Sequence, residues 1–553
     1  MPDGTAGHPM TALGRRKARG AFFTPAPIAR YVTRWALRGS SGRVLEPSSG
    51  EAAFLLAAAE FGGSEWLLDG VELHPASAQA ARSALEATGI RATVTTADFF
   101  TLDPTGDYDA VIGNPPYVRY HDFTGSDRAR AQAAARRAGV SLSGLASSWA
   151  AFTLHASRFL RPGGRLGLVL PAELLSVNYA APVRRYLLEN FARVRLVAFT
   201  ERVFPGVVAE IVLVLADGFH SPSNSHRRET RLETLQVRNA AALEELPAEP
   251  VFESFTVPSP DRKWTPALIP AEPLRAFDQL LRGPEFSVLD DWGRVSLGIV
   301  TGNNSYFALT LDEADARGLG PADLLPLSPP GSSHLRGLDF SADALRELGE
   351  NGSAVRLFRP ADRRSPAAAA YVRAGEAMGV DEAYKCRIRT PWWQVRLASP
   401  PDLLLTYMNA DAPRLVTNSA RAHHLNSVHG VHLHHPDPSG LLPLAALGSV
   451  SLLGAETVGR SYGGGLLKLE PSEAKQLPLP SPDLLKAATP ALTQIRPAVA
   501  TALSRFRLAE AVSMVDEALL NHTLGLAPET VTHLRAAHAH LQKRRQDRAR
   551  TRF

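Results

Sequence analysis

Apolar and polar positions follow two different patterns along the chain, and the change falls near its middle. In the first half, short apolar runs of strand length are followed by longer stretches with helical periodicity. The runs that predict strands are 44–45, 67–71, 92–96, 108–113, 165–170, 193–199 and 210–216, and the helical stretches are 52–61, 76–88 and 145–160. Such alternation is typical of a doubly wound α/β fold, whose largely parallel sheet binds ligands at the carboxyl ends of its strands.

Four polar residues stand at the ends of successive predicted strands. They are Glu46, Glu72, Asp98 and Asn114. Because parallel strands end at one edge of the sheet, we expect these four side chains to share a site. A single residue takes such a position by chance, but four in succession indicate function.

The pattern changes at residue 251. Residues 251–274 are proline-rich and are predicted to be a linker, and the strands and loops beyond them lack strand–helix alternation. The last part of the chain is helical and ends in basic residues. We therefore expect a disordered N-terminus at 1–19, an α/β domain at 20–250, a linker at 251–274, a mixed α+β domain at 275–484 and a helical segment with a basic tail at 485–553.

Composition supports a multidomain globular protein. The 553 residues are 45% hydrophobic and 21% charged, which is ordinary for such a chain, and the length predicts two or more domains. A net charge of +5 and a pI near 9.3 lean weakly towards a polyanionic partner. The single cysteine, Cys386, excludes a disulfide framework. With no apolar stretch of about 18 residues and a polar N-terminus unlike a signal peptide, we expect a cytoplasmic protein and no membrane partner.

The most informative segment is Asn114-Pro115-Pro116-Tyr117, which follows the predicted strand at 108–113. The two prolines fix φ and remove two N–H donors, so the loop presents acceptors. A residue before proline is held in an extended conformation, which restrains Asn114. The Asn114 side-chain oxygen and the Pro115 carbonyl can together accept both hydrogens of a planar amino group, and Tyr117 offers a flat face to a ring.

The other strand ends suit a cofactor that contains adenosine. Gly50 lets the backbone pass close to a ligand where the loop opens a helix N-terminus. Glu72 is placed to bind the two hydroxyls of a ribose, and Asp98 can accept a hydrogen bond from an adenine amino group while Phe99 packs beside the ring. The Gly-x-Gly-x-x-Gly pattern is absent, which argues against NAD.

These motifs occur in the order of a known family. Residues 20–25 (Gly-Ala-Phe-Phe-Thr-Pro), residues 46–54 (Glu-Pro-Ser-Ser-Gly-Glu-Ala-Ala-Phe), Glu72, Asp98-Phe99 and Asn114-Pro115-Pro116-Tyr117 resemble the motifs of the gamma-class DNA amino-methyltransferases. The resemblance is to the TaqI-like and Eco57I-like enzymes that methylate the N6 amino group of adenine. It implies a Rossmann-like domain with a seven-stranded mixed sheet, followed by a target-recognition domain at 275–484.

The resemblance also implies S-adenosyl-L-methionine as cofactor and double-stranded DNA as partner. The methionine part would be held by Phe23, Thr24, Pro25, Glu46, Pro47 and Gly50, the ribose by Glu72, and the adenine by Asp98 and Phe99. In the family an aromatic residue in the position of Phe204 stacks on the target base opposite the motif tyrosine. A separately encoded restriction endonuclease would be the functional counterpart.

A duplex base cannot present its amino nitrogen to the cofactor, so such an enzyme flips the nucleotide out of the helix. Stacking between Tyr117 and Phe204 would recover part of that cost. Asn114 and Pro115 would then take the amino hydrogens and aim the nitrogen lone pair at the methyl carbon. Catalysis would come from orientation and electrostatics, without a covalent intermediate.

The second half contains three segments similar to those in the specificity regions of these methyltransferases: 297–307, 387–393 and 459–465. Arginines here could contact phosphates or read guanine, although a structural aromatic corner with solvated arginines explains the pattern equally well. The residues expected to contact DNA are Tyr306, Arg387, Arg389, Trp392, Trp393 and Tyr462.

Two further features of the second half are each open to two interpretations. Six histidines between residues 423 and 435 match no zinc-binding spacing, so a histidine-rich loop or plain surface is expected and no metal. The basic residues from Lys543 to Arg552 could contact phosphates non-specifically or form a solvated tail.

Several alternatives remain. N4 methylation of cytosine uses the same kind of contact with an amino group, although that family more often has serine where this chain has Asn114. Enzymes that methylate RNA or a protein glutamine share the Asn-Pro-Pro-Tyr loop but lack the large C-terminal half. A fused nuclease lacks a recognisable motif, and a non-enzymatic DNA-binding module is at odds with the intact Glu46, Gly50, Asp98 and Asn114.

Overall fold

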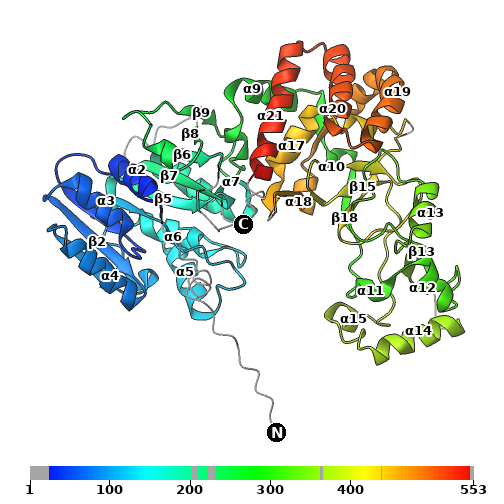
Figure 1. The fold of residues 1–553 in the computed structure, drawn as a ribbon, viewed down its shortest axis with the longest axis horizontal. Coiled ribbons are helices and arrows are strands. Elements are labelled where there is room, and N and C mark those ends of the chain that lie inside the picture. Colours follow the sequence, from blue (N-terminus) through cyan, green and yellow to red (C-terminus); the bar gives the residue numbers. More distant parts are fainter. Residues whose placement is uncertain are drawn as a thin grey trace, which may run out of the picture. The chain divides into compact units, whose positions relative to one another are not determined.

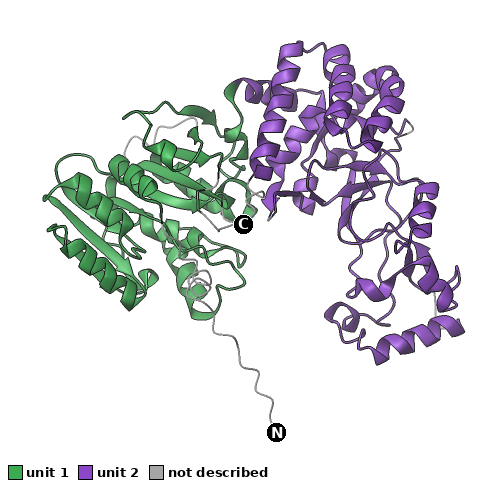
Figure 2. Cartoon of the chain, viewed as in Figure 1, with its two compact units in different colours: residues 1–271, 551–553 green, residues 272–550 purple. Residues whose placement is uncertain are grey.

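The computed structural model describes residues 24–201, 203–204, 210–220, 231–360, 365–437, 439–462 and 464–547. These form two compact units, the first ending at Ala271 and the second beginning at Glu272 (Figure 2). The expected disordered N-terminus, the cofactor residue Phe23, part of the motif around Phe204, Gly463 and the last residues of the basic tail lie outside the described residues.

Nine strands form one sheet in the described part of the first unit (Figure 1). Their order is β3-β2-β1-β4-β5-β7-β6-β8-β9. The bounds are β1 Gly42–Glu46, β2 Trp66–Glu72, β3 Ala92–Thr96, β4 Tyr108–Gly113, β5 Leu160–Pro171, β6 Phe191–Phe199, β7 Ile211–Phe219, β8 Arg231–Val237 and β9 Glu253–Thr256. The expected doubly wound α/β fold is confirmed, with two more strands than the seven expected.

Strand direction places the predicted site residues at one edge. Strands β3, β2, β1, β4 and β5 run parallel, and β7 lies antiparallel between β5 and β6. The register pairs Leu45 of β1 with Val111 of β4, so the loops that begin near Glu46 and Asn114 leave the sheet side by side. Glu72 ends β2 and Asp98 follows β3 on the same edge.

Helices cover the sheet of the first unit. They are α2 Ala26–Ala36, α3 Ala53–Gly62, α4 Pro75–Glu86, α5 Gly125–Arg137, α6 Ser148–Ser157, α7 Glu173–Ser176 and α8 Ala181–Asn190, with short 3-10 turns at Phe99–Thr101, Asn178–Ala180, Ala241–Leu243 and Thr265–Leu268. Proline in the first turn of α2, α4 and α8 suits a position whose N–H needs no helical partner. Apolar side chains of α2, α3 and α4 pack on strands β1, β2 and β4 in the core.

The segment predicted to be a linker, residues 251–274, belongs largely to the first compact unit. Residues Glu253–Thr256 add strand β9 to the sheet, and Trp264 is fully buried with its N–H donated to the Leu175 carbonyl at 2.8 Å. Pro266 stands at the start of a 3-10 turn, where a missing N–H costs little.

The described part of the second unit contains four small sheets. The largest has the order β11-β18-β15-β17 and is antiparallel, and the others are β12-β14-β13, β16-β20-β19 and β10-β21. The strands are β10 Phe286–Val288, β11 Gly293–Leu297, β12 Ala308–Leu309, β13 Leu324–Pro326, β14 Arg356–Phe358, β15 Leu403–Thr406, β16 Met408–Asn409, β17 Leu415–Thr417, β18 Val428–Leu433, β19 Arg460–Tyr462, β20 Leu466–Lys468 and β21 Pro478–Pro480.

Helices complete the second unit. They are α9 Ala271–Arg282, which begins one residue before this unit, then α10 Leu289–Trp292, α11 Asn304–Phe307, α12 Leu311–Ala316, α13 Ala342–Glu350, α14 Pro366–Ala377, α15 Tyr384–Arg387, α16 Leu442–Ala445, α17 Ser449–Val458, α18 Pro471–Ala474, α19 Pro482–Ser504, α20 Leu508–Asp516 and α21 Pro528–Asp547, with a π-helical turn at Glu517–Thr523. Among the described helices, none combines the length and apolar character needed to cross a membrane.

Two described arginines of the expected basic tail are packed, which corrects the prediction for them, whereas Lys543 is exposed. Arg544 and Arg545 lie on α21 with 5% and 2% of their surface exposed. The Arg545 guanidinium pairs with the Glu456 carboxylate of α17 at 2.8 Å and donates to the Asp411 carbonyl at 2.8 Å. These two arginines are therefore fold residues, out of reach of a phosphate backbone.

Candidate active site

The Asn-Pro-Pro-Tyr loop leaves the sheet at the carboxyl end of β4, as predicted. The Asn114 side chain is fixed at both ends: its Nδ2 donates to Thr24 Oγ1 at 3.2 Å, and its Oδ1 lies 2.7 Å from the Tyr117 hydroxyl. Thr24 immediately precedes Pro25, which caps α2, so this helix brings Thr24 to the loop. Two predicted motifs that lie 90 residues apart therefore meet at one amide group.

Three consecutive carbonyls of this loop differ in their partners. The Asn114 carbonyl accepts a hydrogen bond from Ser48 Oγ at 3.2 Å, and the Pro116 carbonyl accepts one from Ser148 Oγ. No donor among the described residues contacts the Pro115 carbonyl between them. The loop thus keeps one backbone acceptor open next to the Asn114 amide.

Ser148, which sequence reasoning missed, holds the loop from the side opposite Ser48. Besides donating to the Pro116 carbonyl, its hydroxyl accepts from the Val118 N–H at 2.9 Å, and its own N–H donates to the Val118 carbonyl at 3.0 Å. Ser148 is the first residue of α6 and is 2% exposed. A serine at a predicted helix start was the available signal, but its partners are set by tertiary packing.

Tyr117 points its hydroxyl inward. The oxygen lies 2.7 Å from Asn114 Oδ1 and 2.9 Å from the Val169 carbonyl, so its single proton can serve one of these acceptors at a time. Burial raises the pKa of the Tyr117 phenol well above its ordinary value, which keeps the group protonated. The ring packs against the hydrophobic cluster that also contains Phe204, which is 4% exposed.

The loop at residues 46–52, which the sequence predicts to hold a cofactor, is built around the buried carboxylate of Glu46. Glu46 is 2% exposed and accepts the Leu55 N–H at 3.1 Å, at the N-terminus of α3. Burial raises the pKa of Glu46 well above its ordinary value, against the opposing effect of the hydrogen bonds from the α3 backbone. Pro47 lies beside Gly113 of β4. The Glu46 side chain therefore connects the loop to the N-terminus of α3.

Glu72 joins two loops. Its Oε2 accepts the Gly50 N–H at 2.9 Å and its Oε1 accepts the His74 N–H at 2.8 Å. A carboxylate has about four acceptor positions, so two remain for further donors such as the hydroxyls of a ribose. Glu72 is buried, with 8% of its surface exposed.

Open space and an unpartnered hydroxyl lie in the same loop. Gly50 has φ +52°, and a Cβ built there would meet no atom within 4 Å. The Ser49 hydroxyl is buried and lacks a hydrogen-bond partner in the part of the chain that the structure describes. A loop with a close backbone approach and a spare polar group fits a bound small molecule.

Asp98 and Phe99 form the third part of the edge. Asp98 Oδ1 accepts the Phe100 N–H at 3.0 Å, and its Oδ2 pairs with Arg130 Nε of α5 at 2.8 Å. The Phe99 ring is 4% exposed and packs between Phe152 and Phe159, with centroids 4.8 and 5.0 Å away. Arg130 was not predicted, because α5 lies in a stretch with no strand-end motif.

The candidate DNA residues of the second unit fall into two groups. Tyr306 is 3% exposed and stacks on Tyr371 at 4.5 Å, and each phenol donates to the other residue's carbonyl. Trp392 packs in the same cluster and donates to Glu376 at 3.2 Å, and Trp393 packs beside it. These three aromatic residues form the structural corner.

The remaining candidates reach the surface. Arg387 and Tyr462 are exposed, and the Lys468 ammonium lies 5.1 Å from the Tyr462 ring centroid. Arg389 is half-buried, and its guanidinium donates to the Thr301 carbonyl at 2.7 Å and to the Val300 carbonyl.

The histidine-rich segment is only in part the exposed surface that the sequence predicts: His434 and His435 are exposed, but three of the other histidines are buried. His423 and His424 are 8% and 7% exposed, and His429 is fully buried in β18 with its Nε2 2.7 Å from the Leu469 carbonyl. Burial lowers the pKa of His424 to about 4, with further lowering from neighbouring histidines. These side chains are neutral near pH 7.

Comparison with known proteins agrees with this arrangement. Residues 69–204 match the family described as Eco57I restriction-modification methylase, and residues 261–520 match the family described as type II methyltransferase M.Eco57I, C-terminal domain. Type II methyltransferase M.XamI of Xanthomonas campestris pv. amaranthicola is 30% identical over 495 residues, covering 86% of this chain and 88% of that protein. Type II methyltransferase M.AccI of Acinetobacter calcoaceticus is 24% identical over 488 residues, covering 84% and 85%.

A solved structure, the type IIG restriction endonuclease BpuSI, aligns with 96% of this chain and 67% of its own at 13% identity, with a TM-score of 0.44. The sheet with its antiparallel β7 and the Asn-Pro-Pro-Tyr loop, taken with the two type II methyltransferases M.XamI and M.AccI and the two family matches, define a DNA methyltransferase of the gamma amino-methyltransferase class. Within that class, the chain belongs to the Eco57I-like family of type II restriction-modification methyltransferases.

Proposed function

We propose that this protein transfers a methyl group from S-adenosyl-L-methionine to the N6 amino group of an adenine in double-stranded DNA. The observation that supports this proposal most strongly is the pair of hydrogen-bond acceptors at the end of β4. Asn114 Oδ1 stands beside a Pro115 carbonyl that has no donor among the described residues, while both neighbouring carbonyls are tied to serines. An exocyclic amino group has two hydrogens, and this loop offers two fixed acceptors for them.

The chain's contribution to catalysis is orientation. With both hydrogens accepted, the lone pair of the amino nitrogen is directed out of the ring plane and towards the methyl donor. The loop is rigid because of its two prolines and its two serine contacts, so little reorganisation is needed. For Tyr117 to leave Asn114 Oδ1 free, its hydroxyl turns its proton to the Val169 carbonyl, which lies 2.9 Å away.

S-adenosyl-L-methionine would supply an electrophilic methyl group on a sulfonium. The residues proposed to hold it are Thr24 and Pro25 with the 46–52 loop around the methionine part, Glu72 at the ribose, and Asp98 with Phe99 at the adenine. The open space above Gly50, the unpartnered Ser49 hydroxyl and the spare acceptor positions of Glu72 support this assignment.

A base in a duplex is out of reach of this loop, so we propose that the target adenine is flipped out. Tyr117 would stack on it, and Phe204 is the proposed partner on the other face. Both side chains pack in one hydrophobic cluster near the loop. Stacking is worth about 1–3 kcal/mol per base, which offsets part of the unstacking cost.

The second unit is the proposed target-recognition domain, and Arg387, Arg389 and Tyr462 are its candidate DNA residues at or near the surface. The names of the relatives, type II methyltransferases, support a modification enzyme whose counterpart is a separately encoded endonuclease. DNA as substrate makes the cytoplasm the expected location.

Nucleoside analysis of methylated DNA tests the proposal. Plasmid DNA from a host without adenine or cytosine methylases is incubated with the protein and isotopically labelled S-adenosyl-L-methionine, digested to nucleosides and analysed by mass spectrometry. Labelled N6-methyladenine is the expected product. N4-methylcytosine would keep the acceptor geometry and overturn the choice of base, and no labelled nucleoside would overturn DNA as substrate.

A further inference from the structure

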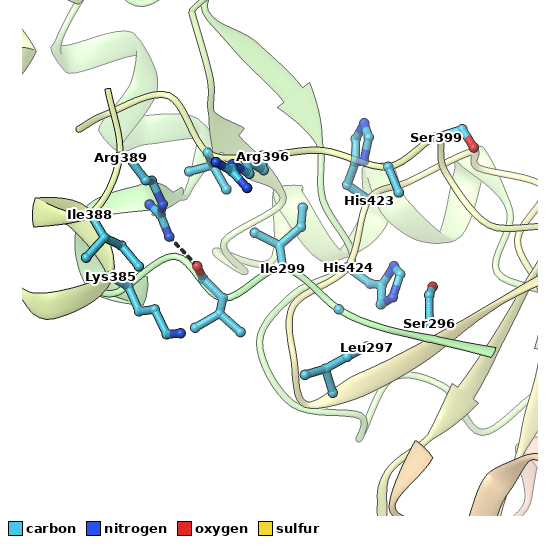
Figure 3. Close-up of a pocket in the computed structure, with 14 residues that line it drawn as sticks. Ser296, Leu297, Ile299, Lys385, Ile388, Arg389, Arg396, Ser399, His423 and His424 are labelled. Atoms are coloured by element: carbon cyan, nitrogen blue, oxygen red, sulfur yellow. Dashed lines mark hydrogen bonds between the residues drawn. The ribbon is translucent and has the colours of Figure 1, made fainter. Parts of the chain in front are cut away.

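A cavity of about 330 Å³ lies within the second unit, and its wall is rich in positive charge. It is bounded by the end of β11, the turn after α15, the following loop to residue 399, and the segment before β18 (Figure 3). Lys385, Arg389 and Arg396 contribute three cations, and no aspartate or glutamate lines the cavity. His423 and His424 form part of the opposite wall.

Arg389 gives the cavity a fixed wall. Its guanidinium donates to the carbonyls of Thr301 and Val300, the second of which is the dashed contact in Figure 3. The strand end is held from the other side as well, because the Ile299 N–H donates to the His424 carbonyl at 2.9 Å. Arg389 therefore shapes the cavity while its charge remains without a carboxylate partner among the described residues.

Arg396 and Lys385 are the accessible charges. Both are exposed, and in the described part of the chain neither forms a hydrogen bond through its charged group or an ion pair; Lys385 only lies near the Tyr384 ring, at 5.4 Å. Elsewhere in this unit, Arg414, Arg460 and Arg545 are each paired with a carboxylate. Burial lowers the pKa of Arg389, and the charge of Arg396 lowers it further, which indicates cations that repel one another.

We propose that this cavity binds a backbone phosphate of the DNA, with Arg396 and Lys385 as its donors and Arg389 as the fixed cation behind them. The proposal rests on the proposed function, since it takes the second unit to be the part that contacts DNA. Clustered positive charge without a counter-charge attracts anions, and guanidinium and ammonium groups are the usual phosphate ligands. The neutral histidines opposite can add hydrogen bonds without charge.

The test is direct binding of the full-length protein to two fluorescein-labelled duplexes of about 40 base pairs and unrelated sequence, over a range of salt concentrations. The variants are Arg396→Ala, Lys385→Ala and the double variant. Arg373→Ala is the matched control, because Arg373 is an exposed arginine of α14, outside the cavity, with no partner among the described residues. Equal melting temperatures would show that all variants fold.

We expect the double variant to bind both duplexes about tenfold more weakly, the effect of losing a hydrogen bond to a charged group. The slope of log Kobs against log salt should fall in magnitude by about 0.9 for the lost phosphate contact, and Arg373→Ala should match the wild type. Equal binding by wild type and double variant would overturn the proposal, as would an equal loss in the control. A loss on one duplex only would assign the cavity to base reading instead, against the phosphate.

Failure of this proposal is separable from failure of the proposed function. Binding is measured without methyl transfer, whereas the proposed function stands on the methylated nucleoside formed by the wild type. A wild type that produces N6-methyladenine alongside a double variant that binds normally removes only the phosphate site. A wild type that binds neither duplex overturns the phosphate site, and the nucleoside measurement then decides the function by itself.

Discussion

The Asn114 amide donates its Nδ2 to Thr24 Oγ1 at 3.2 Å, and this contact fixes which end of the amide is left as an acceptor. With the nitrogen engaged, Oδ1 is turned towards the Tyr117 hydroxyl, 2.7 Å away. We therefore propose that Thr24 positions Asn114 for the reaction, in addition to its proposed place near the cofactor.

Replacing Thr24 by valine should lower kcat about fivefold, because a net hydrogen bond of about 1 kcal/mol is lost and the amide becomes free to flip. Thr24→Ser keeps the hydroxyl and should restore most of the rate. Steady-state methylation kinetics, with KM for the cofactor measured separately, check this. A Thr24→Val enzyme with the wild-type kcat would contradict the positioning role.

Ser148→Ala should lower kcat as well as the melting temperature. The substitution leaves the Pro116 carbonyl and the Val118 N–H without their partner, at a cost of about 1–3 kcal/mol, and it loosens the loop that aims the acceptors. Ser157→Ala is the matched control, because Ser157 is buried on the same helix but bonds to Leu154 and Tyr186, away from the loop. Both variants should lose melting temperature, and only Ser148→Ala should lose turnover; equal turnover in the two would refute the assignment.

Tyr117 should contribute through its ring more than through its hydroxyl. Tyr117→Ala removes a stacking surface worth about 1–3 kcal/mol and should raise KM for DNA about tenfold or more. Tyr117→Phe keeps the ring and should stay within about threefold of the wild type, which corresponds to a loss below that of one net hydrogen bond. Fluorescence of 2-aminopurine placed at the methylated position reports the flipped base, and an unchanged signal in Tyr117→Ala would remove the stacking proposal.

His155 makes the stability of the first unit depend on pH in the acidic range. It is fully buried, its Nε2 lies 3.1 Å from the Phe99 carbonyl, and burial lowers its pKa from 6.5 to about 4. Because the pKa of His155 is lower in the folded state, the unfolded chain binds this proton at a higher pH than the folded chain does. The contribution of His155 to stability is therefore present above pH 6.5 and is lost as the pH falls from 6.5 towards 4.

Melting temperatures measured between pH 4 and pH 8 check this. His155→Gln should show a shallower loss on acidification than the wild type, while His121→Gln, at an exposed histidine, should follow the wild-type profile. Parallel profiles for the wild type and His155→Gln would exclude His155 as the source.

The features that local pattern controls were predictable from the sequence. Strands β3 and β4 have the bounds that their apolar runs predict, and Glu46, Glu72, Asp98 and Asn114 do end or follow successive parallel strands. Such positions follow from alternation and loop residues that are adjacent in the sequence.

The contacts that complete the site depend on residues far apart in the chain. Ser148 stands 32 residues from Pro116, and Arg130 stands 32 residues from Asp98, so neither partner is visible in a local pattern. Arg545 appears in the sequence as part of a basic tail, because its buried carboxylate partner, Glu456, lies 89 residues earlier. The prolines of the expected linker stand beside strand β9 and the fully buried Trp264, whose packing no composition argument reveals.

We propose that the Asn114 side-chain oxygen and the Pro115 carbonyl accept the two hydrogens of an adenine amino group during methylation. The most direct measurement compares wild type with Asn114→Ala for labelled N6-methyladenine formed in DNA, alongside binding of S-adenosyl-L-methionine by calorimetry. We expect N6-methyladenine from the wild type, a loss of at least about a hundredfold in Asn114→Ala, in line with removal of one preorganised group, and cofactor binding retained in both. Full methylation by Asn114→Ala, or no N6-methyladenine from a wild type that binds the cofactor, would contradict it.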